Sequence, residues 1–231
     1  MKHLVLFLLL GCSTLSAQAA DSTLVFTSPE PESIQTSRSS MDDAWGVDIL
    51  LSNNGFGVAG FYRHEYSRDL FGTVIFGLAE SKDDNEVEQY YYPGYSFIRG
   101  KLNRFLVVPL HFGVQYRLFA EDITDSFRPY VNAGVGPTMI LVHPYMDQNT
   151  GDQIEYFSSL GKARPQYTVG GYIGAGAYFG ADMGSLSGIN IRYYFIPVSG
   201  GIESLINDMG RRERKSEFGG FFITINIGSA F

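Results

Sequence analysis

The sequence has little cysteine, little positive charge and no apolar run long enough to cross a bilayer as a helix, which needs about 20 residues. Its only cysteine, Cys12, lies in the N-terminal segment that we expect to be an export signal, so the mature chain is predicted to have no disulfide and no thiol chemistry. The 17 Lys and Arg residues stand against 24 Asp and Glu, giving a formal net charge of −7 at pH 7. Nucleic acid requires a basic surface, so it is excluded as a predicted partner.

The N-terminus has the pattern of a secretory signal peptide. Lys2 precedes an apolar run over residues 4–10, and the small-residue site at residues 17–19 follows. We predict a signal peptide over residues 1–19. The alternative is lipoprotein processing at Cys12. Residues 20–42 are rich in Ser, Thr, Pro and Glu and are predicted to form a flexible periplasmic leader.

The composition instead favours a β-structure that faces lipid on one side. The chain has 27 Gly, 15 Tyr and 18 Phe. Its last twelve residues alternate, with Phe221, Ile223 and Ile225 on one face, where only Ser229 interrupts the apolar row, and Thr224 and Asn226 on the other. Such period-two alternation is typical of a strand with one apolar and one polar face.

Strand-like segments with this patterning recur along the chain, and the lengths of their connections alternate. After a tight hairpin at residues 53–55, short connections (68–70, 120–126, 181–185) interleave with long polar ones (82–103, 143–166, 198–218). Bacterial barrels carry short turns on one side of the membrane and long loops on the other. The sequence therefore predicts an all-β fold, an eight-stranded antiparallel up-and-down transmembrane β-barrel over residues 43–231. The predicted strands are residues 43–52, 57–67, 71–81, 104–119, 127–142, 167–180, 186–197 and 219–231.

The alternation also predicts which side chains face the lumen. A barrel of eight strands is just wide enough for side chains to fill it, so charges inside must be paired or hydrogen-bonded. We interpret the inward polar residues as a network that locks the barrel; a gated passage or an anion site is the alternative. Residues 71–81 are apolar on both faces and receive no assignment. The predicted lumen network is Asp48, Arg63, Glu65, His111, Gln115, Arg117, Arg128, Asn190 and Arg192.

With this topology, the export signal, the aromatic C-terminus and segments such as residues 128–137 (RPYVNAGVGP), the chain resembles the small eight-stranded outer-membrane barrels, which include the OmpA-type transmembrane domain and its barrel-only relatives. The resemblance covers residues 43–231. It implies location in the bacterial outer membrane, contact with outer-membrane lipids, and Phe231 as the signal that the outer-membrane assembly machinery reads.

Some such barrels modify lipid A, so the histidines were considered as catalytic candidates. A deacylase needs His and Ser close together with an acid to orient the His. His64 has Ser67 three positions on, which is the opposite face of a strand; His111 has no nearby serine, and His143 opens a loop. Residues 147–152 lack the order of a calcium loop. We predict no enzyme activity, no cofactor and no metal.

The densest basic patch lies in the last long connection and comprises Arg211, Arg212, Arg214 and Lys215. Arginine grips phosphate with two parallel hydrogen bonds, so the patch could contact lipopolysaccharide; a charged loop balanced by acidic neighbours is the alternative. We therefore predict a structural or surface-interaction barrel with a packed lumen, acting through three long extracellular loops on a ligand that the sequence does not identify. A narrow channel for small or hydrophobic solutes is the main alternative, followed by a lipid A-modifying enzyme. A soluble lipocalin-like barrel is the rival at the level of the fold.

Overall fold

The computed structural model describes residues 43–91, 95–120, 123, 126–147, 150–180 and 184–231. The predicted signal peptide and leader, residues 1–42, lie outside this part of the chain. In the part that is described, no helix combines the length and the apolar character needed to span a membrane.

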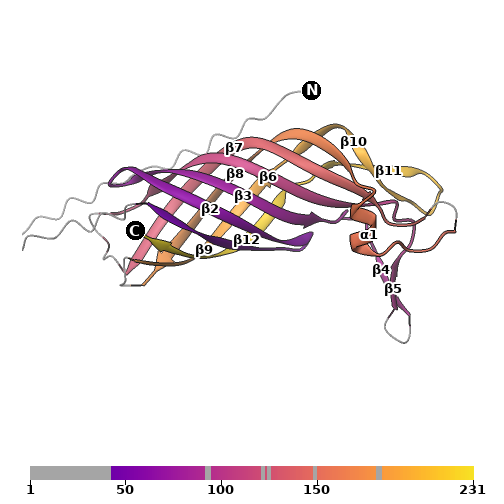
Figure 1. Ribbon diagram of the computed structural model, residues 1–231, viewed down its shortest axis with the longest axis horizontal. Coiled ribbons are helices and arrows are strands. Elements are labelled where there is room, and N and C mark those ends of the chain that lie inside the picture. The colour runs from indigo at the N-terminus through magenta and orange to yellow at the C-terminus, as the bar shows by residue number, and fades with distance from the viewer. Residues whose placement is uncertain (1–42, 92–94, 121–122, 124–125, 148–149, 181–183) are drawn as a thin grey trace, which may run out of the picture. The chain divides into compact units, whose positions relative to one another are not determined.

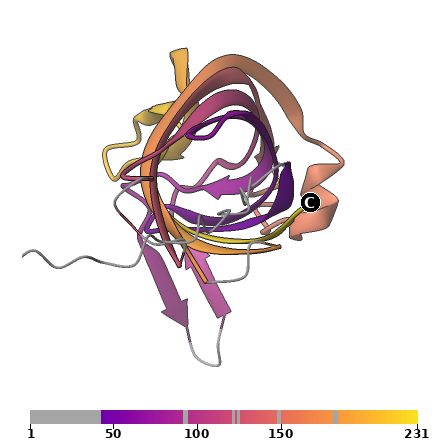
Figure 2. The same cartoon turned by 90° about the vertical axis from the view of Figure 1, so that its left-hand side faces the viewer.

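Eight antiparallel strands form a closed barrel (Figures 1 and 2). Following the hydrogen bonds around the barrel, the order is β1-β12-β9-β8-β7-β6-β3-β2, so each barrel strand pairs with the barrel strands before and after it in sequence, except where the first meets the last. The first and last strands close the ring, with Trp45 opposite Ser229 and Leu51 opposite Ile223. The barrel strands are β1 (Ala44–Ser52), β2 (Gly55–Ser67), β3 (Leu70–Ser81), β6 (Asn103–Arg117), β7 (Phe127–Pro144), β8 (Arg164–Phe179), β9 (Ser185–Phe195) and β12 (Gly220–Ala230).

The strands alternate between buried and exposed residues, and the exposed row is apolar. Along β12 the burial changes at almost every residue, with Phe221 and Ile223 outside and Phe222 and Thr224 inside. In a soluble barrel the apolar row would face inward. The exterior row of large apolar side chains includes Trp45, Val47, Val58, Phe76, Phe112, Val114, Val135, Ile173, Ile189, Ile191 and Ile227. This exterior suits hydrocarbon, where a closed sheet satisfies all of its backbone groups.

β3 is the strand that the sequence left unassigned. Its inward row is Phe71, Thr73 and Ile75, whereas Val74 and Phe76 point outward. Both rows are apolar because the inward one meets a largely apolar part of the lumen, described below, so patterning alone could not separate the two faces.

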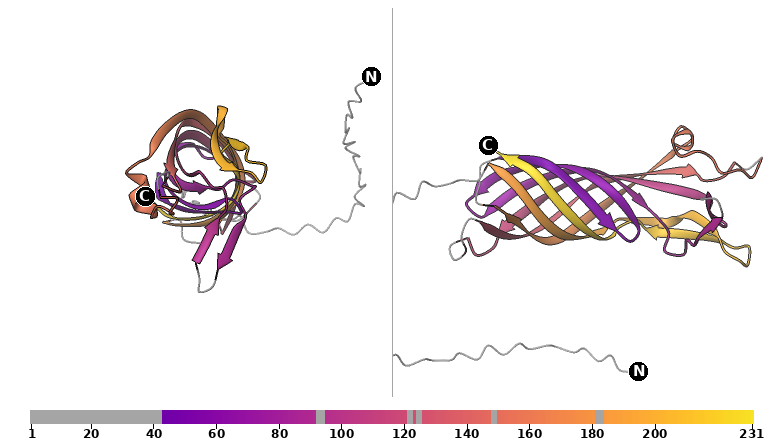
Figure 3. Two further views of the ribbon diagram at one scale, coloured as in Figure 1. Left: turned by 90° about the vertical axis from the view of Figure 1, so that its right-hand side faces the viewer. Right: turned by 90° about the horizontal axis from the view of Figure 1, so that it is seen from below.

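The connections alternate in length as predicted, and all the long ones emerge at one end, here called the long-loop end. The opposite, short-turn end carries the C-terminus (Figure 1). The long connections, which the sequence analysis describes only as long and polar, have secondary structure of their own. They contain two hairpins and a short helix, which project beyond the barrel strands (Figure 3): β4 (Glu88–Tyr91) with β5 (Tyr95–Ile98), α1 (Tyr156–Leu160), and β10 (Pro197–Ile206) with β11 (Arg212–Glu217). These hairpins were not predicted because β4 and β5 have only four residues each, and β10 and β11 show no regular apolar alternation.

Glycines on the inward rows make room for large side chains from other strands. A Cβ at Gly134 would lie 2.5 Å from the Tyr172 ring, and one at Gly113 would lie 2.7 Å from its hydroxyl oxygen. Tyr172 can therefore cross the lumen only because these two positions lack side chains.

Candidate functional site

The centre of the lumen holds a buried ion pair between β1 and β9. Asp48 is fully buried and its Oδ2 accepts a hydrogen bond from Arg192 Nη1 at 2.6 Å. The other carboxylate oxygen, Oδ1, accepts from Asn226 Nδ2 at 2.5 Å. Both oxygens are thus satisfied by side chains from neighbouring strands, which is the condition under which a buried charge pair is tolerated.

The network continues from Asn226 across to the far wall of the barrel. Tyr130 on β7 donates its hydroxyl hydrogen to Asn226 Oδ1 at 3.2 Å, and Asn190 Nδ2 on β9 donates to the Tyr130 hydroxyl at 3.0 Å. Each donor in this chain of bonds points toward Asp48, so every bond reinforces the polarity of the next. Asn226 and Tyr130 were not among the predicted network residues, although both lie on the polar faces of their predicted strands.

The remaining predicted lumen residues lie at two levels along the barrel axis, and His111 and Gln115 form the first. His111 is fully buried, lies between the rings of Tyr172 and Tyr194, and bonds through Nε2 to Thr138 Oγ1 at 3.1 Å. Gln115 accepts a hydrogen bond from the Tyr178 hydroxyl at 3.4 Å.

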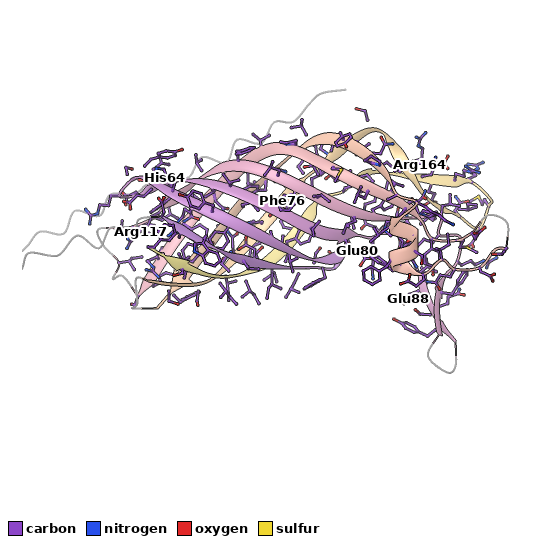
Figure 4. All side chains as sticks on the ribbon, viewed as in Figure 1. His64, Phe76, Glu80, Glu88, Arg117 and Arg164 are labelled. Atoms are coloured by element: carbon purple, nitrogen blue, oxygen red, sulfur yellow. The ribbon has the colours of Figure 1, made fainter. Side chains whose placement is uncertain are left out.

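The other four predicted residues are charged and occupy the short-turn half of the barrel, where Figure 4 labels Arg117. Arg63 is buried with its guanidinium 4.6 Å from the centroid of the Phe71 ring. Arg128 is also buried, while Glu65 and Arg117 are partly exposed, and none of these three is without a partner.

Toward the long-loop end the lumen becomes apolar. The inward row of β6 that carries His111 and Gln115 continues outward as Pro109, Val107 and Phe105. These side chains form an apolar block above the polar network, which the sequence analysis did not anticipate. The buried apolar cluster comprises Leu50, Ala59, Phe61, Ile75, Phe105, Val107, Ile140, Tyr172, Tyr194, Ile196, Phe218 and Phe222.

A second buried ion pair lies among the long connections. Lys101 Nζ donates to Glu86 Oε2 at 2.5 Å, and each side chain is only 4% exposed. Lys101 also lies 5.6 Å from the centroid of the Tyr145 ring. The ion pair links Glu86, which precedes β4, to Lys101. The backbone of Lys101 also forms an isolated β-bridge with Leu205 on β10.

The structure brings His143 and Ser159 together, a pairing that sequence reasoning missed. His143, at the outer end of β7, has its Nδ1 2.8 Å from Ser159 Oγ on α1, and both residues are fully buried. The Ser159 hydroxyl donates to the Tyr156 carbonyl at 2.6 Å and also lies 3.4 Å from Arg104 Nη1. Ser159 Oγ is thus within hydrogen-bond distance of the imidazole, the Tyr156 carbonyl and the Arg104 guanidinium, and these contacts attach α1 to the outer end of β7. No local motif could have predicted this contact, since it depends on how α1 folds back onto β7.

The N-terminus of α1 is capped by an acid. The Glu155 carboxylate accepts hydrogen bonds from the backbone N–H groups of Ser158 at 2.8 Å and Phe157 at 3.2 Å. These bonds favour the charged form and lower the pKa of Glu155 below its usual value of 4.5.

The residues of the predicted basic patch that belong to β11 lie on different faces of that strand. Arg212 pairs with Glu203 at 2.8 Å, and Arg214 Nη2 donates to the Gly201 carbonyl at 3.0 Å. Lys215 is buried, and its ammonium donates to the Lys82 carbonyl at 2.7 Å. Lys215 therefore points away from Arg212 and Arg214 because successive residues of a strand alternate faces.

Arg211, the last member of the patch, is exposed between the two strands of the hairpin. Phe231 follows β12 and is 68% exposed; its role as an assembly signal stays a prediction. Within the described residues, no group of three or more His, Cys, Asp and Glu could hold a metal ion.

No family model and no curated protein matches this chain. Among solved structures, the chain is similar to Neisserial surface protein A (11% identity, TM-score 0.49), covering 82% of this chain and 95% of that one. It is also similar to the N-terminal β-barrel domain of Pseudomonas aeruginosa OprF (11% identity, TM-score 0.41, covering 82% and 98%). A third is the outer membrane protein OprG from Pseudomonas aeruginosa (10% identity, TM-score 0.43, covering 82% and 94%).

The geometry of the chain itself defines the class of protein. A closed antiparallel barrel of eight strands, apolar outside and polar at the centre, with short turns at one end and long connections at the other, is a transmembrane β-barrel of the bacterial outer-membrane type. The predicted fold class, the predicted resemblance and the predicted location in the outer membrane are confirmed.

Proposed function

We propose that this protein is a surface-interaction barrel: a sealed outer-membrane anchor that presents a rigid platform at its long-loop end to the outside of the cell. The observation that carries the proposal is the layering of the lumen. The buried Asp48–Arg192 pair and the apolar block above it support a barrel closed by its own side chains, because an eight-stranded barrel is just wide enough for side chains to fill it.

The platform is supported by contacts that fix the long connections. The buried Lys101–Glu86 pair secures the connection that carries β4 and β5. Hydrogen bonds from Leu102 N to the Ser204 carbonyl and from Ile206 N to the Gly100 carbonyl attach β10 to the chain that enters β6. A preorganised surface loses less conformational entropy on binding than a mobile loop does, which suits recognition.

We propose no enzymatic activity for the platform. The pairing of His143 with Ser159 supports an architectural role, because the serine hydroxyl also contacts the Tyr156 carbonyl and both residues are fully buried. The proposed partners are outer-membrane lipids and lipopolysaccharide around the barrel, and the assembly machinery during insertion.

Surface labelling of intact cells tests which end of the barrel faces outward. Met209→Cys and Tyr90→Cys place a thiol on side chains that are 80% and 76% exposed at the long-loop end. Phe119→Cys is the matched control at the short-turn end, where the side chain is 61% exposed. A membrane-impermeant maleimide should label the first two variants in intact cells and the third only after lysis. Labelling of Phe119→Cys in intact cells, with the other two protected, would overturn the proposal.

One observation favours a second candidate, lateral movement of small apolar solutes through the barrel wall. Between β3 and β6 the register pairs Phe76 with Leu110 and Ala79 with Val107, but the intervening described residues do not pair, and Pro109 has no N–H to donate. An apolar cavity lies behind this seam, yet its volume of about 20 Å³ accommodates little more than one water. A small apolar solute would therefore have to separate β3 from β6 at this seam. Pro109→Val, which restores the backbone N–H at this position, should slow the uptake of such a solute.

A further inference from the structure

A polar cleft opens at the long-loop end between the barrel wall and the last hairpin. Its volume is about 840 Å³, which lies within the range of small-ligand sites. One wall comes from the outer ends of β7 and β8, the other from β10 and β11. Figure 4 labels Arg164, at the start of β8, at this end of the barrel.

The cleft exists because β9 and its continuation part from β8. The last pair between β8 and β9 joins Gly171 to Phe195, so the outer part of β8, residues 164–170, has only β7 as a ladder partner within the described chain. Beyond Phe195 the chain enters β10, whose pairing with β11 shifts register twice, and the first shift is a bulge between Pro197 and Ile202. Gly200 and Gly201 sit in this bulge with φ of +76° and +62°, a left-handed conformation that glycine adopts without strain.

The charge of the cleft is opposite to that of the protein. The whole chain carries a formal net charge of −7. A concave site whose own charge is positive attracts anions. Cations outnumber acids in the lining: the basic residues are Lys162, Arg164, Arg212 and Arg214, and the acidic ones are Asp147 and Glu203.

Two of the four cations are not neutralised by these acids. Arg212 pairs with Glu203 at 2.8 Å, and Lys162 lies 3.8 Å from an Asp147 carboxylate oxygen. Within the part of the chain that the structure describes, Arg214 donates to a backbone carbonyl, and neither Arg214 nor Arg164 forms an ion pair. These two guanidinium groups belong to opposite walls, β8 and β11, so an anion between them could accept hydrogen bonds from both.

We propose that this cleft binds a phosphate or sulfate group carried by a sugar. Arginine forks suit such oxyanions, and the side-chain amides of Asn103 and Gln166 in the same lining can bond to hydroxyl groups. The lining contains no Phe, Tyr or Trp, so it offers no platform on which a nucleobase could stack. This inference names the ligand class of the proposed surface-interaction role and rests on that role.

The same chemistry has two sources, which the experiment separates. In one arm, the folded protein in detergent is titrated by calorimetry with glucose 6-phosphate, and with glucose as the uncharged control. In the other arm, the protein is mixed with vesicles that contain either phosphorylated or enzymatically dephosphorylated lipopolysaccharide. Both arms use wild type, Arg164→Gln and Arg214→Gln. Arg211→Gln is the matched control, because it removes the same charge from the same hairpin but outside the cleft lining.

The expected result is phosphate-dependent binding that weakens about tenfold or more in Arg164→Gln and in Arg214→Gln, as the loss of a hydrogen bond to a charged group implies, and less than about twofold in Arg211→Gln. If this pattern appears in the calorimetric arm, the ligand is a soluble sugar phosphate. If it appears only in the vesicle arm, the ligand is a membrane glycolipid. Absence of binding in both arms, equal binding of glucose, or an equal loss in Arg211→Gln would overturn the proposal. Retention of heat-modifiable gel migration shows that each variant is folded. A failure of the surface-interaction role itself would appear instead in the labelling experiment.

Discussion

Replacing Asp48 with asparagine tests whether the lumen is dry. The substitution keeps the size of the side chain but removes the charge that Arg192 Nη1 contacts at 2.6 Å. Arg192 is 3% exposed and lies beneath the apolar block, so it cannot turn to solvent. Its remaining neighbours are neutral, with the Tyr194 hydroxyl at 3.4 Å.

The structure sets the size of the expected effect. Breaking a buried pair by removing one partner costs about 3–5 kcal/mol, since the other charge stays buried without compensation. We expect Asp48→Asn to lie near the lower end of this range because the amide oxygen of asparagine still accepts a hydrogen bond. The double variant Asp48→Asn/Arg192→Met removes both charges and should recover to within about 1 kcal/mol of wild type.

Urea unfolding in lipid vesicles measures these differences. Trp45 is the only tryptophan and lies on the lipid-facing row of β1, so its fluorescence reports loss of the barrel. Extrapolation to zero urea gives the free energy of unfolding for each variant. A loss below about 1 kcal/mol in Asp48→Asn, the value typical of solvent-exposed pairs, would refute the reasoning and indicate a hydrated lumen.

Three further outcomes are expected. Gly136→Ala should block barrel assembly, because its Cβ would lie 2.1 Å from a backbone carbonyl of β6, whereas Gly60→Ala, with a nearest atom at 4.0 Å, should fold like wild type on heat-modifiability gels. Glu86→Gln should leave Lys101 buried without its acid and increase protease cleavage of the β4–β5 connection, while the barrel itself stays resistant. The pKa of Glu155 is lowered, so its cap stabilises α1 fully above pH 4.5, the unfolded value, and the stabilisation is lost as the pH falls through the folded pKa. Amide exchange of α1, corrected for intrinsic rates, should therefore become faster at low pH in the wild type. In Glu155→Gln the corrected exchange should not depend on pH in this range.

Most of the barrel could be predicted from the sequence because every barrel strand except β3 has one face patterned for lipid and one for the lumen. A lipid-facing row and a lumen-facing row alternate along β6, β9 and β12, so period two identifies both the strand and its inward side. Connection lengths then supplied the topology, since a closed up-and-down barrel sends alternate connections to opposite ends.

The parts that could not be predicted depend on contacts between distant segments. Asp48 and Arg192 could each be assigned to the lumen, but their pairing depends on which strands meet across it. His143 meets Ser159 only because α1 folds onto β7. The apolar residues of the β10 and β11 hairpin do not alternate regularly, so its strands resemble a polar loop in sequence, and the cleft beside it could not be foreseen.

The sealed lumen is the central claim, and ionic current through single molecules tests it most directly. Purified wild-type protein inserted into a planar bilayer in 1 M salt should show no discrete current steps above the membrane background, because the packed interior gives ions no hydrated path. Reproducible, salt-dependent steps from the wild-type barrel would contradict the account and favour a channel.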